Sequence, residues 1–136
     1  MQQVYNPYAQ YRNQRNHLIE SADRVTLVSM LLEGAINYNK KALLALEQDD
    51  RITVLESINY ATKIVLHLYS CLNFEEGGEI ADRLAKLYHF ICEQYVVYQK
   101  NIKNTVPVIT INRILSSIHE GWKTLPNTAG REEQQV

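Results

Sequence analysis

The side chains of this sequence that could hold a metal ion are its histidines and cysteines. His67 and Cys71 stand four residues apart and His89 and Cys92 three apart, so each pair would share one face of a helix. Imidazole and thiolate are ligands that zinc accepts. If the two segments form a hairpin that turns near residues 73–77, however, His89 lies ~9 Å along the helix axis from the level of His67, at ~1.5 Å per residue. The two pairs cannot meet around one ion, and the sequence predicts neither a metal nor a cofactor.

Other arrangements that carry out catalysis are missing from the sequence as well. No histidine follows a glutamate by three residues, which excludes the Glu-x-x-His pairs of a di-iron bundle. No candidate nucleophile stands on a strained turn beside a base. The string Gly77-Gly78-Glu79 lacks the further glycines and the Lys-Ser/Thr pair of a phosphate-binding loop. The sequence therefore predicts a protein that is not an enzyme.

Length, charge and termini narrow the class of protein further. At 136 residues and 46% hydrophobic content, the chain can bury one core without a disulfide or metal. Its net charge of −1 and its mixed charges argue against nucleic acid as a partner, and its short apolar runs argue against membrane insertion. The N-terminus lacks the features of a secretory signal. We expect a cytoplasmic protein in which Cys71 and Cys92 are reduced core residues.

Helical periodicity organises most of the chain. Apolar residues recur at steps of three and four over residues 21–47, 51–72, 78–101 and 105–123, which indicates four amphipathic helices. The β-branched string TVPVITI in the last segment could also form a strand, but its apolar spacing favours a helix. Because short connections make neighbouring helices antiparallel, the predicted fold is all-α: an antiparallel up-down-up-down four-helix bundle over residues 21–125.

The two ends differ from the bundle in composition. Residues 1–20 are polar and rich in tyrosine, and Asn6-Pro7 is a typical helix start, so we expect a short extra N-terminal helix there. Tyr8 and Tyr11 would share one face of it. Such a short helix is marginal alone and should dock on an apolar surface. Residues 126–136 are polar and without periodicity, which predicts a disordered tail.

Two of the predicted helices carry more apolar residues than a two-sided bundle contact needs. Leu27 and Leu31 widen the stripe of the first long helix. The residues that widen the stripe of the second are Val54, Ile64, Leu66 and Leu68. Apolar surface left over on a small protein usually marks a partner site, and an amphipathic helix is its natural ligand. Ordinary burial in the core is the alternative, and the sequence leaves it open.

Several strings in the chain occur in an order and spacing that resemble one known family. They are NPYAQY near the N-terminus, LLEGAINY at 31–38, LNFEEGGEIADRLAKLY at 72–88 and the late Trp122. Together they resemble the flagellar secretion chaperone family, FliS, over residues 5–123. The chain departs from the family pattern at Ser21-Ala22, at Leu31-Leu32 and at Asn104 to Pro107, which suggests a divergent member.

The resemblance implies both a fold and a function. Members of that family are cytoplasmic four-helix bundles that bind the C-terminal region of flagellin, prevent its premature polymerisation and keep it competent for type III export. The resemblance also implies that Tyr8 and Tyr11 cover the flagellin surface in the free protein. The adjacent Gly77 and Gly78 themselves predict a structural turn, because two glycines at a helix junction let the backbone bend sharply. Other flagellar export components are further candidate partners. The alternative reading is a bundle adaptor that binds another amphipathic helix or pairs with itself.

Overall fold

Four helices make up the part of the chain that the computed structural model describes, residues 24–123. They are α2 (Arg24–Glu47), α3 (Arg51–Ser70), α4 (Phe74–Lys100) and α5 (Val106–Lys123), and these residues contain no strand. The predicted all-α fold is confirmed. The predicted N-terminal helix within residues 1–20 and the predicted tail of residues 126–136 lie outside the described residues.

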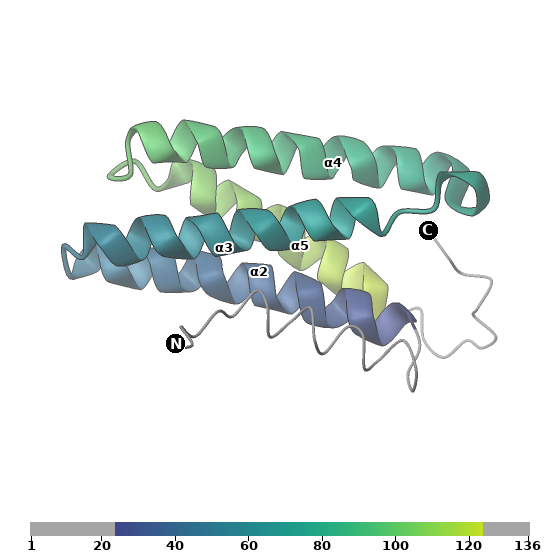
Figure 1. Ribbon diagram of the computed structural model, residues 1–136, viewed down its shortest axis with the longest axis horizontal. Helices are drawn as coiled ribbons and strands as arrows, with labels where there is room; N and C mark the ends of the chain where they lie inside the picture. The colour runs from purple at the N-terminus through teal and green to yellow at the C-terminus, as the bar shows by residue number, and fades with distance from the viewer. Residues whose placement is uncertain (1–23, 124–136) are drawn as a thin grey trace, which may run out of the picture.

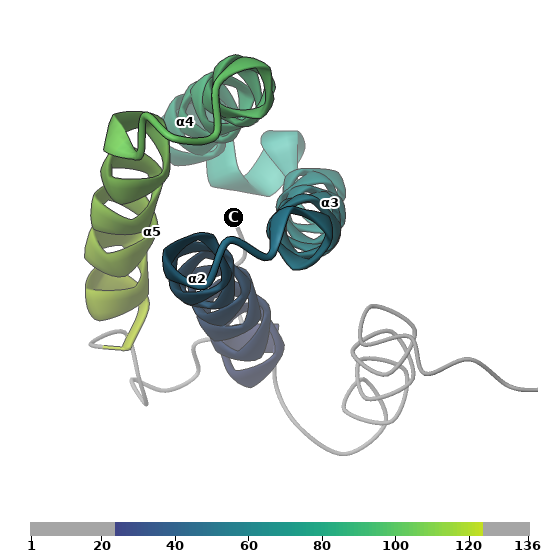
Figure 2. The ribbon, with the colours of Figure 1, turned by 90° about the vertical axis from the view of Figure 1, so that its left-hand side faces the viewer.

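The helices run alternately up and down around a shared core. Each packs on its neighbour in the chain, and α5 returns to pack on α2, which closes the bundle (Figures 1 and 2). Seen end-on, α4 lies diagonally across the bundle from α2, while α5 is tilted and moves away from α4 along its length (Figure 2). This arrangement is the antiparallel four-helix bundle that the short connections predict.

Short polar residues begin the helices by accepting hydrogen bonds from free backbone N–H groups. The side chain of Asp50 accepts from the Thr53 N–H at 3.1 Å at the start of α3. The side chain of Asn73 accepts from the Glu76 N–H at 3.0 Å at the start of α4. Before α3, Asp49 adopts a positive φ of 59°, the left-handed conformation with which a helix commonly ends.

The start of α4 differs from the sequence prediction, which placed a turn at residues 73–77 and the helix after it. Helix α4 begins at Phe74, and its first turn precedes a kink at Gly78, where φ is 51° and ψ is −125°. Glycine reaches this conformation without the clash that a Cβ would cause. The cap at Asn73 explains the early start, because it satisfies a backbone donor that would otherwise need water.

The β-branched segment before residue 112 is helical. Helix α5 contains Val106 to Ile111, and the Asn104 side chain accepts from the Val106 N–H at 3.2 Å. Pro107 lies in the first turn, where its missing N–H costs nothing. The apolar spacing therefore outweighed the strand propensity of TVPVITI, because it buries Val108, Ile111 and Leu115 on one side.

A polar group sits inside the apolar core where three helices meet. Asn39 of α2 is fully buried, and its carbonyl oxygen accepts a hydrogen bond from the Tyr95 hydroxyl of α4 at 2.8 Å. Its amide nitrogen donates to the side-chain oxygen of Asn112 on α5 at 2.7 Å. The Asn112 amide in turn donates to the Ile36 carbonyl at 3.5 Å. Both ends of the buried Asn39 amide are thus satisfied, as burial in the core requires.

Candidate functional site

An open groove runs between α3 and α4 on the surface of the bundle. It has a volume of about 360 Å³, which is in the range of ligand pockets, and its surface is mainly apolar. From α3 it is lined by Leu66 and Tyr69; the lining residues from α4 are Tyr88, His89, Cys92, Glu93 and Val96. Leu66 is 53% exposed and Val96 54% exposed, so apolar side chains on both walls are in contact with solvent. The groove can therefore bury apolar groups of a partner.

Aromatic residues extend the groove at the end of α3. The ring of Tyr69 packs edge-on against that of Phe74, with 6.5 Å between the ring centroids. Both side chains remain nearly half exposed. Phe74 is the first residue of α4, and the Asn73 cap positions the turn that carries it. Exposed aromatic rings of this kind are typical of interface anchors.

The groove contains ionisable side chains whose protonation depends on their burial. Burial raises the pKa of the Cys92 thiol, which keeps it in the weakly nucleophilic protonated form. Burial, with a smaller contribution from Cys71, raises the pKa of the Tyr88 phenol above its usual range. At the rim, the His89 ring lies 3.6 Å from the Glu93 carboxylate, and both side chains are largely exposed. The polar rim can give orientation to a partner, while the groove itself offers apolar contact.

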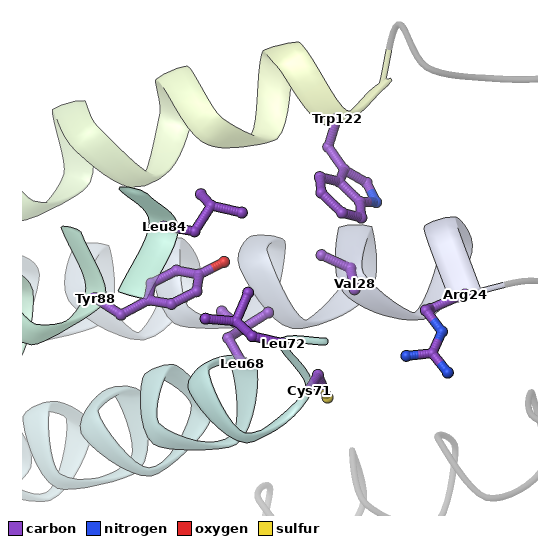
Figure 3. A pocket seen from close by; sticks show the side chains of 8 residues that line it. All are labelled: Arg24, Val28, Leu68, Cys71, Leu72, Leu84, Tyr88 and Trp122. Carbon is purple, nitrogen blue, oxygen red and sulfur yellow. The ribbon is translucent and has the colours of Figure 1, made fainter. Parts of the chain in front are cut away.

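A second cavity lies at the end of the bundle where α2 begins, and Figure 3 shows the side chains around it. Its lining residues come from all four helices and from the connection between α3 and α4: Arg24, Val28, Leu68, Cys71, Leu72, Leu84, Tyr88 and Trp122. Its volume is only about 10 Å³, roughly enough for one water molecule. The Trp122 indole lines it and donates a hydrogen bond to the Val25 carbonyl at 3.1 Å. We interpret it as a small packing gap in the core.

Four of the apolar residues that the sequence suggested as partner contacts lie in the core. Their exposed fractions are 6% for Leu27, 2% for Leu31, 0% for Ile64 and 2% for Leu68. The folded bundle thus leaves little of their surface free, and a contact with a partner stays a prediction that requires the helices to separate. The two tyrosines suggested as contacts, Tyr8 and Tyr11, lie outside the described residues.

Sequence reasoning singled out Leu66 as surplus apolar surface but missed the groove that it forms with residues of α4. Tyr69 looked like part of the core stripe of α3, and Val96 fits no stripe, yet both are exposed at the groove. Periodicity shows which face of a helix is apolar but not how far two neighbouring helices stand apart. The signal that could have found Val96 is its position beside Val97, outside the steps of three and four on which Ile91, Tyr95 and Tyr98 recur.

The described residues contain neither a metal-ligand cluster nor a helix that could span a membrane. Within residues 24–123, no three or more His, Cys, Asp or Glu side chains gather where they could hold a metal ion. Across the same residues, none of the helices has the length and hydropathy that a membrane span requires. Cys71 and Cys92 are not joined in a disulfide, and both are only partly buried.

Comparison with known proteins assigns a family to this architecture. A family model described as "Flagellar protein FliS" matches residues 4–129. The Salmonella typhimurium protein named flagellar secretion chaperone FliS is 33% identical over 119 residues, which cover 86% of this chain and 87% of the relative. Its namesake in Vibrio cholerae is 31% identical over 79% of each chain. The Bacillus subtilis protein of the same name is 25% identical over 88% of this chain and 86% of its own length.

Proposed function

This chain belongs to the flagellar protein FliS family, and we propose that, as a flagellar secretion chaperone, it binds the C-terminal region of flagellin before export. By holding that region, the chaperone would keep flagellin from polymerising early and leave it competent for type III export. Other flagellar export components remain candidate partners. The activity is binding without catalysis, in the cytoplasm.

The observation that carries the proposal is the open apolar groove between α3 and α4. An amphipathic helix can lay its apolar face into such a groove, with its side chains spaced at three and four residues as anchors. Leu66 and Val96 would contact such a face from opposite walls, and Tyr69 would cover its end. A segment that folds as it binds exchanges chain entropy for this contact area, which suits a client that must later be released.

The N-terminal segment has a place in this proposal. We infer that Tyr8 and Tyr11 act as a displaceable cover of the flagellin surface, as the family resemblance implies. A cover that must leave before flagellin binds lowers the apparent affinity, which becomes the intrinsic affinity multiplied by the fraction of molecules whose surface is uncovered. Alanine at both tyrosines should therefore alter the affinity for flagellin.

Calorimetric titration with the C-terminal segment of flagellin from the same bacterium tests the proposal. We expect saturable binding near one-to-one, with a negative heat-capacity change because apolar surface is buried. Leu66→Asp should weaken binding by about tenfold or more, the scale on which an interface anchor is lost. Leu44→Asp is the matched control, because Leu44 is 60% exposed but lies on α2, away from the groove residues.

Two results would count against the proposal. Absence of binding at micromolar concentrations would exclude flagellin as the client. Equal affinities of the two aspartate variants would show that flagellin binds but uses another surface than the groove. Circular dichroism of both variants confirms that each remains folded, since both substitutions replace exposed leucines.

A further inference from the structure

The groove depends on where α4 stands, and α4 is held by little apolar burial. Only five of its 27 residues are buried: Ala81, Tyr88, Ile91, Tyr95 and Tyr98. By contrast, α2 buries eleven of its 24 residues. Apolar contacts are not directional, so they distinguish between neighbouring positions of a helix less sharply than a buried hydrogen bond does. Something more specific is needed to fix α4 at one distance from α3.

Directional contacts of this kind come from the buried polar group around Asn39, which we call the Asn39 hub and define as Asn39, Tyr95 and Asn112. The Tyr95 hydroxyl reaches the Asn39 carbonyl oxygen at 2.8 Å, and both residues are at most 1% exposed. The Asn39 amide donates to Asn112 at 2.7 Å. Any shift of α4 that breaks the first bond leaves two buried polar groups unpaired, which is far more costly than a shifted apolar contact.

The hub acts on the turn of α4 that also forms the groove wall. Tyr95 directly precedes Val96, and it follows Cys92 by three residues, so the three share one stretch of helix. The hydroxyl of Tyr95 points inward to α2, while Cys92 and Val96 line the groove toward α3. The Tyr95 bond to Asn39 ties α4 to α2. Because α3 packs along α2, the same bond limits where the α4 wall can lie relative to Leu66 and Tyr69.

From this geometry we propose that Asn39 is a positioning residue for the client groove: through Tyr95 it sets the register of α4 and hence the width of the groove. The predicted effect on flagellin binding rests on the proposed function. The predicted position of α4 does not, because it can be measured without flagellin. Polar groups in a core have a known use of this kind, since a single buried Asn can fix the register of packed helices.

The first test follows the spacing between α3 and α4. It measures the rate at which a thiol reagent labels Cys92 in the full chain that carries Cys71→Ser. Cys92 is half-buried in the groove wall, so its labelling rate reports the spacing of α3 and α4. We expect Asn39→Leu to raise this rate by about tenfold, the scale of mutations that act on a site through intervening contacts. Val54→Ala, a fully buried α3 change outside the hub, is the control for general destabilisation and should stay within about twofold.

A second variant keeps the proposal testable if Asn39→Leu fails to fold. Asn39→Leu with Tyr95→Phe and Asn112→Leu replaces every hub partner by an apolar side chain of similar shape, which can be close to neutral for stability. In the Cys71→Ser chain, this triple variant should stay folded and show the faster Cys92 labelling. In the full natural chain, it should bind the flagellin segment about tenfold more weakly.

Each result has a clear meaning. A triple variant that is folded and labels Cys92 at the rate of the unchanged hub would overturn the positioning role of Asn39. Faster labelling with unchanged flagellin affinity would show that the hub positions α4 but that flagellin does not use this groove, and it would contradict the binding half of the inference. Failure of the parent chain to bind flagellin would count against the proposed function and leave the labelling result standing.

Discussion

Helices α2 and α4 are the longest two of the described residues, and they are used in opposite ways. The inward-facing residues of α2 include Leu32, Ala35 and Ala42, all with no exposed surface, and Leu44 is its one large apolar residue that is exposed. Helix α4 leaves six such residues exposed: Phe74, Ile80, Leu87, Phe90, Val96 and Val97. The difference indicates that α2 provides stability, while α4 keeps apolar surface available for contacts.

The strongest test of this contrast is the same truncation in both helices. Leu32→Ala removes a fully buried side chain from α2 and should lower the free energy of unfolding by about 3–5 kcal/mol, because a cavity remains. Leu87→Ala on α4, where the side chain is 37% exposed, should cost less than about 1 kcal/mol. Urea unfolding followed by circular dichroism measures both. Equal losses of unfolding free energy in the two variants would contradict the contrast between α2 and α4.

A backbone change at the start of α4 should have an intermediate effect. Gly78→Ala places a Cβ at a φ of 51° and a ψ of −125°, and we expect it to cost about 1–3 kcal/mol of stability. Apart from the adjoining backbone, no atom lies within 4 Å of the added Cβ, so the loss would come from strain in the local backbone and not from contact with another helix. Gly77→Ala is the neighbouring control, because φ of Gly77 is not positive. Similar unfolding midpoints for the two variants would show that the kink needs no glycine.

The substitution with the smallest expected effect on stability at neutral pH removes a buried phenol of α4. Burial raises the pKa of Tyr88 and of Tyr95 above the unfolded value of about 10. Because the neutral form is favoured in the folded state, their contribution to stability is fully present below pH ~10 and is lost as the pH rises beyond it. Tyr88→Phe removes one of these groups and should flatten the loss of stability between pH ~10 and ~11.5.

Urea midpoints measured from pH 7 to 11.5 check this expectation. The variant and the parent chain should follow the same curve at neutral pH and separate only in the alkaline range. If the urea midpoints of the two chains already differ at pH 7 and then change in parallel up to pH 11.5, the effect of Tyr88→Phe comes from packing and not from titration.

The fold could be predicted from the sequence to a large extent because apolar periodicity is a local property. The steps of three and four along residues 24–47 and 51–70 determine which side of each helix is buried, whatever the exact packing. Even the β-branched start of α5 followed this rule. The start of α4 could not be predicted in the same way, since it depends on whether Asn73 caps a turn before the glycines, and a polar residue beside two glycines is equally typical of a loop.

The site was harder to predict, for a physical reason. Leu31 and Ile64 appeared to be surplus because their stripes are wide, but each of these helices packs on two neighbours and buries a wide face. The groove arises from the spacing between α3 and α4, a tertiary quantity that no single stripe encodes. Asn39 was visible in the sequence as a polar member of an apolar stripe, yet its partners Tyr95 and Asn112 lie 56 and 73 residues away.

The central claim, that flagellin binds in the groove between α3 and α4, is tested most directly by nuclear magnetic resonance of the labelled chain. Resonances are compared before and after addition of the C-terminal segment of flagellin. The account predicts the largest shifts at Leu66, Tyr69, Cys92 and Val96, with small shifts at the buried α2 residues Leu32 and Ala35. Largest shifts along the exposed side of α2, with the four groove residues unmoved, would contradict it.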